Sequence, residues 1–477
     1  PYQEDQVLFN YWLTLQEKTS FTVEASYRKA WKHWSKDSQD SELENLALSL
    51  QQFLSFSGSS SLFNLKLAKQ AVALCEKNNS HQLNASFNNL ARLHKDRGEY
   101  NTALTIFQCL LTNSEKSLKP NHIATGLFLN NLASALTDLG DYVGAEPLFR
   151  RALAISEKSL GPNHAVTWNR LNNLAEFLGK KEDYAEAEQI HRRALSISER
   201  VLGVYHPDTA ISLNNLAIVL AETEKSNEAE LLFRRALTIT EKNLGSNHQD
   251  TANRLYNLAT IFQDRGYFEQ AEDFYRRSLV IIEKNLGHNN PVTATFLTGL
   301  ATVLDDMCNY KASEPLHRRA LFIAEKTFAI NNFKIRSKIC NLAQCLNALE
   351  NQEEAEQLFR KELDICEKYL GLENFETQES LHNLGIVLCE WERYDEAEQI
   401  LRKVVTLREQ YLNPEDSNLL ANSLSDLGFI LAKKSCTKEA YDIYQQALSI
   451  MLNNFDDDEP ETVEIQERIA ELSNIGK

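Results

Sequence analysis

The sequence is poor in the two residues that most often interrupt helices. Its 477 residues include only 9 prolines and 16 glycines, below the average usage of about 5% and about 7%. Leucine, alanine, glutamate, lysine and arginine, which favour helices, are abundant. This composition predicts an all-α fold without strands.

The sequence also lacks long apolar runs and an excess of positive charge. Its apolar runs are far shorter than the about 20 residues that span a bilayer, and charges stand among the first 30 residues where a signal peptide has an apolar core. The 67 acidic and 50 basic residues give a net charge of −17, which repels a phosphate backbone. We therefore expect neither a membrane nor a nucleic acid as partner.

The motifs of common active sites are missing as well. The sequence contains no HExxH, GxSxG, P-loop or GxGxxG string, and no grouping of Cys, His and Asp that suggests a nucleophile. His164, His206 and His248 recur at a constant interval, but successive repeats would hold them at least about 8 to 10 Å apart. Zinc ligands must all lie about 2 Å from one ion. We expect no catalytic residue, no metal and no cofactor.

The eight cysteines show no CxxC pair and no spacing typical of a disulfide framework. Most stand next to apolar residues at helical positions, which predicts buried, reduced thiols in a cytoplasmic protein. The cysteines are at positions 75, 109, 308, 340, 345, 366, 389 and 436.

A leucine followed by a small residue returns every 42 positions over most of the chain. A constant period of this length is typical of stacked repeats, none of which can bury its apolar face alone. The sequence therefore predicts a solenoid. The pairs are Leu90-Ala91, Leu132-Ala133, Leu174-Ala175, Leu216-Ala217, Leu258-Ala259, Leu300-Ala301, Leu342-Ala343, Leu384-Gly385 and, after one extra residue, Leu427-Gly428 and Ile469-Ala470.

Each repeat contains the pattern of two helices. In the repeat at 124–163, Leu129, Leu132 and Leu136 form one apolar stripe that ends near Gly140, and a second stripe follows from 142 to about 158. Asp141 can cap the second helix. Small residues stand where the two helices should cross, because they let helix axes approach closely. Those matching Ala145 are Ala187, Ala229, Ala271, Ser313, Ala355, Ala397 and Ala440.

This pattern of large and small residues resembles the tetratricopeptide repeat, and the strings LNNLA, RRALAISEKSLG and HPDTA resemble the kinesin-light-chain subclass with its longer period. The resemblance covers about residues 86 to 455 and implies a right-handed α-solenoid of about ten repeats. The expected organisation is an irregular helical cap at 1–41, a degenerate first repeat at 42–85, nine repeats at 86–459 and a capping helix at 460–477.

In tetratricopeptide arrays the first helix of each repeat lines a concave groove. Asparagine recurs there just before the repeated leucine, although it is a middling helix former. Its amide can grip the backbone of an extended peptide; alternatively, these amides tie neighbouring helices together or reflect duplication. The predicted groove residues are Asn89, Asn130, Asn131, Asn172, Asn173, Asn214, Asn215, Tyr256, Asn257, Arg170 and Arg254.

The basic residues divide into two groups. Kinesin light chains are understood to hold acidic aromatic peptides with bases beside such asparagines, but here the first helices supply few, chiefly Arg92, Lys95, Arg170 and Arg254. This departure argues against an acidic partner. The double arginines of the second helices resemble an anion-binding stripe, yet the first of each pair follows a glutamate by four residues, as Arg150 follows Glu146. That spacing favours a solvated ion-pair face.

These features predict a non-enzymatic, cytoplasmic scaffold that binds a protein or peptide in the groove, and they leave the oligomeric state open. The alternative is the sensor or regulatory part of a larger signalling protein, either an NTPase switch or a caspase-like protease, whose catalytic part precedes Pro1. The absence of an initiator methionine favours this alternative.

Overall fold

The computed structural model describes residues 44, 47–48, 62–78, 80, 82–118, 121–223, 225–327, 335–412, 417–454 and 460–475. All regular secondary structure in these ranges is helical, and twenty α-helices follow one another along the chain. The predicted all-α solenoid of helix pairs is confirmed. The predicted cap at 1–41 lies outside the described residues.

The chain divides into two compact units. The first unit, residues 1–303, contains α4 (Leu62–Lys77), α5 (Leu83–Asp96), α6 (Tyr100–Ser117), α7 (Ile123–Leu139), α8 (Tyr142–Leu160), α9 (Ala165–Lys180), α10 (Tyr184–Val201), α11 (Pro207–Glu222), α12 (Ser226–Leu244), α13 (Gln249–Asp264), α14 (Phe268–Leu286) and most of α15 (Pro291–Asp306). The second unit, residues 304–477, contains the end of α15 and then α16 (Tyr310–Thr327), α17 (Arg336–Ala348), α18 (Gln352–Leu370), α19 (Phe375–Glu390), α20 (Tyr394–Tyr411), α21 (Ser417–Lys433), α22 (Thr437–Asn454) and α23 (Pro460–Ile475).

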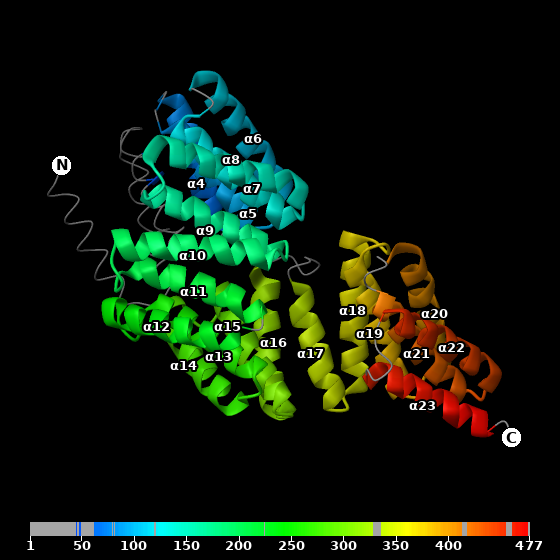
Figure 1. The fold of residues 1–477 in the computed structure, drawn as a ribbon. Helices are drawn as coiled ribbons and strands as arrows, with labels where there is room; N and C mark the ends of the chain where they lie inside the picture. The colour runs from blue at the N-terminus through cyan, green and yellow to red at the C-terminus, as the bar shows by residue number, and fades with distance from the viewer. Residues whose placement is uncertain are drawn as a thin grey trace. The chain divides into compact units, whose positions relative to one another are not determined.

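Within the first unit, helices α7 to α13 stack in chain order. Each contacts the next, and the first helices of successive repeats also contact one another, α7 with α9, α9 with α11 and α11 with α13. Figure 1 shows α9 to α12 lying side by side in this order. The first helices thus form one continuous wall of the first unit.

The predicted crossing residues are buried. Ala145 and its counterparts in every later repeat, from Ala187 to Ala440, have no exposed surface. Leu132, Ala133, Phe149 and Ala152 are buried with them, so the core follows the phase of the repeat. This confirms the packing expected for small residues at helix crossings.

Histidine caps the first helix of several repeats. The Nδ1 atom of His122, His164, His206 and His248 accepts a hydrogen bond from the backbone N–H two residues later, at 3.1 to 3.2 Å. Asn290 and Asn374 make the same bond with a side-chain oxygen. The recurring histidines therefore act as N-caps, which satisfy backbone donors that have no partner inside the helix.

The arginines of the second helices form the predicted ion-pair face. Arg150 pairs with Glu146 on its own helix at 2.9 Å and with Glu186 of the next repeat at 2.7 Å. Arg192 forms the equivalent pairs with Glu188 and Glu228. Since these carboxylates occupy the guanidinium groups, the anion-binding alternative for this stripe has no support.

The cysteines depart in part from the prediction. Cys75, Cys345 and Cys366 are buried, but the thiols of Cys109, Cys308 and Cys436 are exposed. Cys308 and Cys436 lie between helices, so they do not belong to a helix face that packs against a neighbour. None of the helices in the described part of the chain is long and apolar enough to cross a membrane.

Candidate functional site

The repeated asparagines link successive first helices through their side chains. The Nδ2 group of Asn131 donates to Oδ1 of Asn88 at 2.7 Å, that of Asn173 donates to Oδ1 of Asn130 at 3.0 Å, and that of Asn257 donates to Oδ1 of Asn214 at 2.8 Å. Each bond joins residues 43 positions apart. We call this series the asparagine ladder.

The two asparagines of each pair differ in burial. The first members, Asn130, Asn172 and Asn214, are buried, whereas the second members of the same pairs are half-buried. The buried amides of Asn130 and Asn214 act as acceptors within the wall. The half-buried ones, which include the predicted Asn89, keep surface toward the solvent, so a role in binding a partner stays a prediction for them.

The ladder lacks one bond in the middle of the first unit. The Nδ2 group of Asn172 donates to the backbone oxygen of Trp168 on the same helix, at 3.1 Å. Its Oδ1 atom is buried without a hydrogen-bond partner among the described residues. Trp168 in turn donates from Nε1 to Oγ of Ser212, at 2.8 Å. A tryptophan therefore makes the link between α9 and α11 that asparagines make elsewhere.

An aromatic cluster ends the ladder after Asn257. The ring of Tyr256 lies 5.0 Å, between centroids, from those of Tyr275 and Phe296, and both contacts are edge-to-face. A Cβ atom at position 299 would lie 2.6 Å from the Tyr256 ring and 2.7 Å from the Tyr275 ring. Gly299 thus replaces the expected asparagine because the rings fill the space, and Tyr256 contributes to packing.

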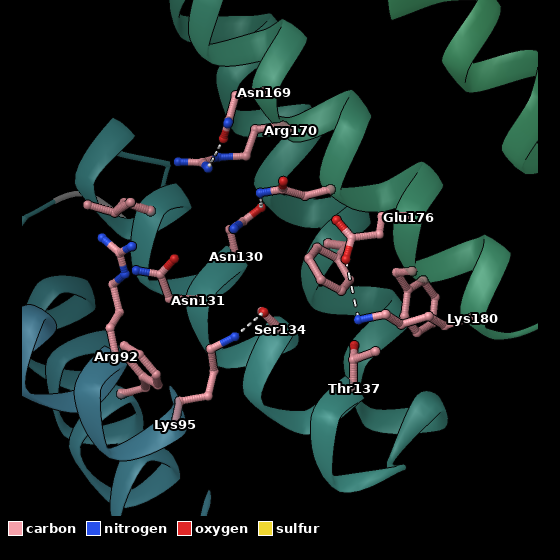
Figure 2. A pocket seen from close by; sticks show the side chains of 15 residues that line it. Arg92, Lys95, Asn130, Asn131, Ser134, Thr137, Asn169, Arg170, Glu176 and Lys180 are labelled. Carbon is pink, nitrogen blue, oxygen red and sulfur yellow. Dashed lines mark hydrogen bonds and ion pairs between the residues drawn. The ribbon is translucent and has the colours of Figure 1, made fainter. Parts of the chain in front are cut away.

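A polar pocket of about 340 Å³ lies where α5, α7 and α9 approach one another. Figure 2 shows the side chains that line it, with Arg92 and Lys95 from α5, Asn131 from α7, and Arg170 from α9. The exposed side chain of Leu127 and the buried rings of Phe107, Phe149 and Phe177 supply its apolar part. Four of the predicted groove residues line the pocket: Asn130, Asn131, Arg170 and Asn173.

Several lining residues were not singled out by the sequence. Asn169, Glu176 and Lys180 share one face of α9 with Asn173, at intervals of three or four residues, and Ser134 stands three residues from Asn131 on α7. Extending the predicted stripe along each helix at this spacing would have found them. The predicted Asn214, Asn215, Tyr256, Asn257 and Arg254 lie on other helices and do not line this pocket.

The two lysines of the pocket have carboxylate partners. The Nζ atom of Lys95 lies 3.0 Å from Oδ2 of Asp138, and that of Lys180 lies 3.7 Å from Oδ1 of the same carboxylate. Lys180 also approaches Glu176, at 3.3 Å. The charges at this end of the pocket therefore balance.

The two arginines of the pocket have no such partner. Arg170 is only 6% exposed, and its sole hydrogen bond to a described residue runs from Nη1 to Oδ1 of Asn169, at 3.0 Å. Its Nε atom is buried without a partner among the described residues, and burial lowers the pKa of its guanidinium. Arg92 is exposed and forms no ion pair with a described residue.

Arg254 occupies on α13 the position that Arg170 occupies on α9. It is 9% exposed, its Nε atom also lacks a partner among the described residues, and burial lowers its pKa against the weaker opposing effect of Asp250. Within the described residues, no group of three or more His, Cys, Asp or Glu side chains is arranged to hold a metal ion.

Comparison with known proteins identifies the repeat. The family model of the tetratricopeptide repeat matches residues 82–158, 165–242, 232–284, 250–326 and 335–410. No curated protein compared with the chain matches it.

Three of the solved structures that match the chain are described here. The repeats of a protein described as a putative kinesin light chain of Podosopora anserina are 23% identical, covering 42% of this chain and 95% of that one, with a TM-score of 0.37. BtubC (BKLC) from P. vanneervenii is 21% identical over 46% of this chain and 89% of its own, with a TM-score of 0.39. The quorum sensor NprR from B. thuringiensis, in its apo form, is 14% identical over 77% of this chain and 98% of its own, with a TM-score of 0.51.

At these identities, the similarity to solved structures concerns the fold alone. The family match is more specific, because its segments together cover more than half of the chain and carry the repeated leucine and alanine positions. The protein belongs to the tetratricopeptide repeat family.

Proposed function

We propose that the protein is a non-enzymatic, cytoplasmic scaffold that holds an extended segment of a partner protein along the wall formed by α5, α7, α9, α11 and α13. The observation that carries this proposal is the polar pocket on three successive first helices. Its amides come from positions that carry asparagine in several repeats along the wall, so one partner segment can contact several repeats.

Half-buried amides suit this task. Asn131 and Asn173 each use one N–H in the ladder, which leaves a second N–H and the oxygen for a partner. An extended peptide offers backbone N–H and C=O groups at regular intervals, and such hydrogen bonds supply register. Leu127, which also lines the pocket and is 38% exposed, offers apolar contact to a side chain of the partner.

The free thiols favour a reducing compartment for this scaffold, because three of them are exposed to solvent. We place no catalytic step in the chain. The proposal concerns only binding.

The test is site-specific photo-crosslinking in lysate of the native organism. A photoreactive residue replaces Ser134, which lines the pocket, and in a second variant it replaces Leu231, which is 68% exposed on α12. Both variants keep the ladder and the core. We expect the first variant to crosslink one defined partner segment that mass spectrometry identifies.

Two further results complete this test. Competition by the synthetic segment should abolish the crosslink at 134 and leave any crosslink at 231 unchanged. If the same partner crosslinks only at 231, then the wall is not the binding surface, and the proposal is wrong.

A further inference from the structure

We infer that the chain associates head to tail, because a basic edge of its first unit fits an acidic edge of the second unit in another copy. The first loop edge is the row of loops that follow α8, α10 and α12, at 160–164, 202–206 and 244–248. The second loop edge comprises residues 369–375, between α18 and α19, and 409–411, at the end of α20. The inference goes beyond the proposed function, since it concerns these loops and not the wall.

Large apolar side chains are exposed along the first loop edge. Tyr205, in the loop after α10, is 68% exposed. A leucine is exposed at the same position of three successive repeats, and two valines are exposed near the middle one. An extended apolar patch on a surface typically marks an interaction site. The side chains beside Tyr205 are Leu160, Val201, Leu202, Val204 and Leu244.

Hydrogen bonds between repeats hold these loops in place. The Nδ2 group of Asn243 donates to the backbone oxygen of Tyr205, at 2.9 Å, and that of Asn285 donates to the backbone oxygen of Asn247, at 2.7 Å. The Nζ atom of Lys242 lies 5.4 Å from the centre of the Tyr205 ring. The exposed side chains therefore stand on ordered loops, so a partner does not have to order them on binding.

The first loop edge has an excess of positive charge. A base recurs in the last turn of five successive second helices, and none of the five forms an ion pair with a described residue. The glutamates before them have other partners, as Glu157 has Arg193, at 2.6 Å. Asp208 and Asp250 approach only their capping histidines, at 3.8 and 3.6 Å, and are outnumbered by the bases. The five bases are Lys116, Lys158, Arg200, Lys242 and Lys284.

The second unit has the opposite charge. Residues 304–477 include 33 acidic and 19 basic residues, so most of the net charge of −17 lies in this unit. In the third-last second helix, Glu367 pairs with Lys403, at 3.3 Å. Glu409 occupies the equivalent position one repeat later, but Gln445 replaces the matching base. Glu409 is therefore exposed without an ion pair to a described residue, and so is Glu373.

Exposed aromatic side chains stand among these carboxylates. Tyr369 and Phe375, on either side of the loop between α18 and α19, are each about half exposed, and Leu372 is exposed between them. Tyr411 is exposed one repeat after Tyr369. Lys368 lies over the ring of Tyr369, 5.6 Å from its centre, and offsets one of the two carboxylates. Aromatic residues are enriched in protein interfaces, so this edge suits contact with the leucines and valines of the first.

The two edges thus complement one another. Opposite potentials favour encounter and fix the register of two surfaces, and the apolar side chains on both edges supply contact that excludes water. Every copy carries both edges, so the contact is heterologous. The assembly is therefore either a reciprocal dimer or a longer chain of copies.

Sedimentation velocity of the full chain over a wide range of concentration tests this inference. We expect the mean mass to rise with concentration. Added salt should weaken the association, because it screens attraction between exposed charges.

Two double variants test the two edges separately. Arg200→Glu with Lys242→Glu reverses the first edge, and Glu373→Lys with Glu409→Lys reverses the second; all four residues are exposed, so folding is not at risk. Each double variant alone should associate at least about tenfold more weakly than the wild type, which corresponds to about 1.4 kcal/mol. An equal mixture of the two should recover association, because the basic first edge of one meets the acidic second edge of the other. Recovery in the mixture requires contact between different chains.

Matched controls separate local charge from net charge. Lys66→Glu with Lys69→Glu, on α4, makes the same change in net charge as the first double variant. Glu350→Lys with Glu392→Lys matches the second, in turns at the opposite ends of the helices. Both controls should associate as the wild type does.

Four results would overturn the inference. They are a mass that stays monomeric at every concentration, association that both edge variants retain, controls that weaken association as much as the edge variants, and a mixture that does not recover. If the monomeric chain instead sediments with vesicles of phosphatidylserine and phosphatidylcholine, and Arg200→Glu with Lys242→Glu abolishes this, then the first edge binds an anionic lipid surface and the inference is wrong.

Discussion

Asn173 on α9 donates a side-chain hydrogen bond to Asn130 on α7, at 3.0 Å. The two residues stand one repeat apart, and the acceptor is buried. The bond therefore fastens one repeat to the next on the same wall that we propose to bind a partner. The side chain of Asn173 therefore has both a structural role and a proposed binding role, and experiments can separate the two.

We predict that Asn173→Ala lowers stability and that Asn215→Ala does not. The first change removes a ladder bond and leaves the Asn130 oxygen without its partner, which costs about 1 to 3 kcal/mol for a buried acceptor. The side chain of Asn215 forms no hydrogen bond with a described residue, although it has the same position in its repeat and similar burial. Thermal unfolding followed by circular dichroism measures the difference. Equal melting temperatures of the two variants would show that the ladder does not hold the repeats together.

A second prediction concerns the aromatic cluster. Gly299→Ala should destabilise the first unit, because the new Cβ atom would lie 2.6 Å from the ring of Tyr256 and 2.7 Å from the ring of Tyr275. Overpacking of this kind typically costs about 1 to 3 kcal/mol.

Gly179→Ala is the matched control on α9, since a Cβ atom there would meet nothing within 4 Å. Alanine is favoured over glycine inside a helix by about 0.5 to 1 kcal/mol, so this variant should be as stable as the wild type or more so. Urea unfolding of both variants tests the pair. An unchanged midpoint for Gly299→Ala would contradict the close approach.

The third prediction concerns the small residues at the crossings. Ala229 has no exposed surface, so Ala229→Leu inserts volume between α11 and α12 and should cost about 1 to 3 kcal/mol. Ala221→Leu, at a half-buried position on α11, provides the comparison. Differential scanning calorimetry should show a lower transition for the first variant alone; the same transition for both would contradict the assigned crossing.

The repeat architecture was predictable from the sequence because it depends on local periodicity. Two local features indicate which face each helix buries. They are the interval between Leu132 and Leu174 and the small side chains of Ala145 and Ala187. The glycine after α8 ends that helix with a positive φ of 93°, as expected for a residue without Cβ. Such features need no knowledge of distant contacts.

The pocket was only partly predictable, because its chemistry depends on which groups pair across repeats. A column of asparagines does not show whether an amide faces the solvent or its neighbour 43 residues away. The sequence predicted Arg170 as a groove residue. It did not show that Arg170 is buried without a carboxylate partner among the described residues, or that Lys95 pairs with Asp138 of the next repeat. Gly299 marked the end of the ladder, and only the packed rings explain it.

The last prediction concerns stability in acid. His191 on α10 is 2% exposed, and its Nδ1 atom is buried without a partner among the described residues. Burial lowers its pKa from 6.5 to about 4. The folded chain therefore keeps His191 neutral at a pH where the unfolded chain takes up a proton, so stability falls as the pH drops from about 6.5 toward about 4.

Phenylalanine occupies the equivalent position in both neighbouring repeats, at Phe149 and Phe233. His191→Phe should therefore fold and should lose this contribution to acid sensitivity, which amounts to about 3 kcal/mol at the acid end, since one pKa unit corresponds to about 1.4 kcal/mol.

His206→Asn is the control, because His206 is a helix cap at the surface and Asn290 makes the same cap. Denaturant unfolding at about pH 7 and about pH 4.5 compares the wild type with both variants, spanning most of the interval between the two pKa values. We expect the loss of stability on acidification to be smaller for His191→Phe and unchanged for His206→Asn. If all three proteins lose the same amount, protonation of other groups determines the acid response, and His191 does not contribute to it.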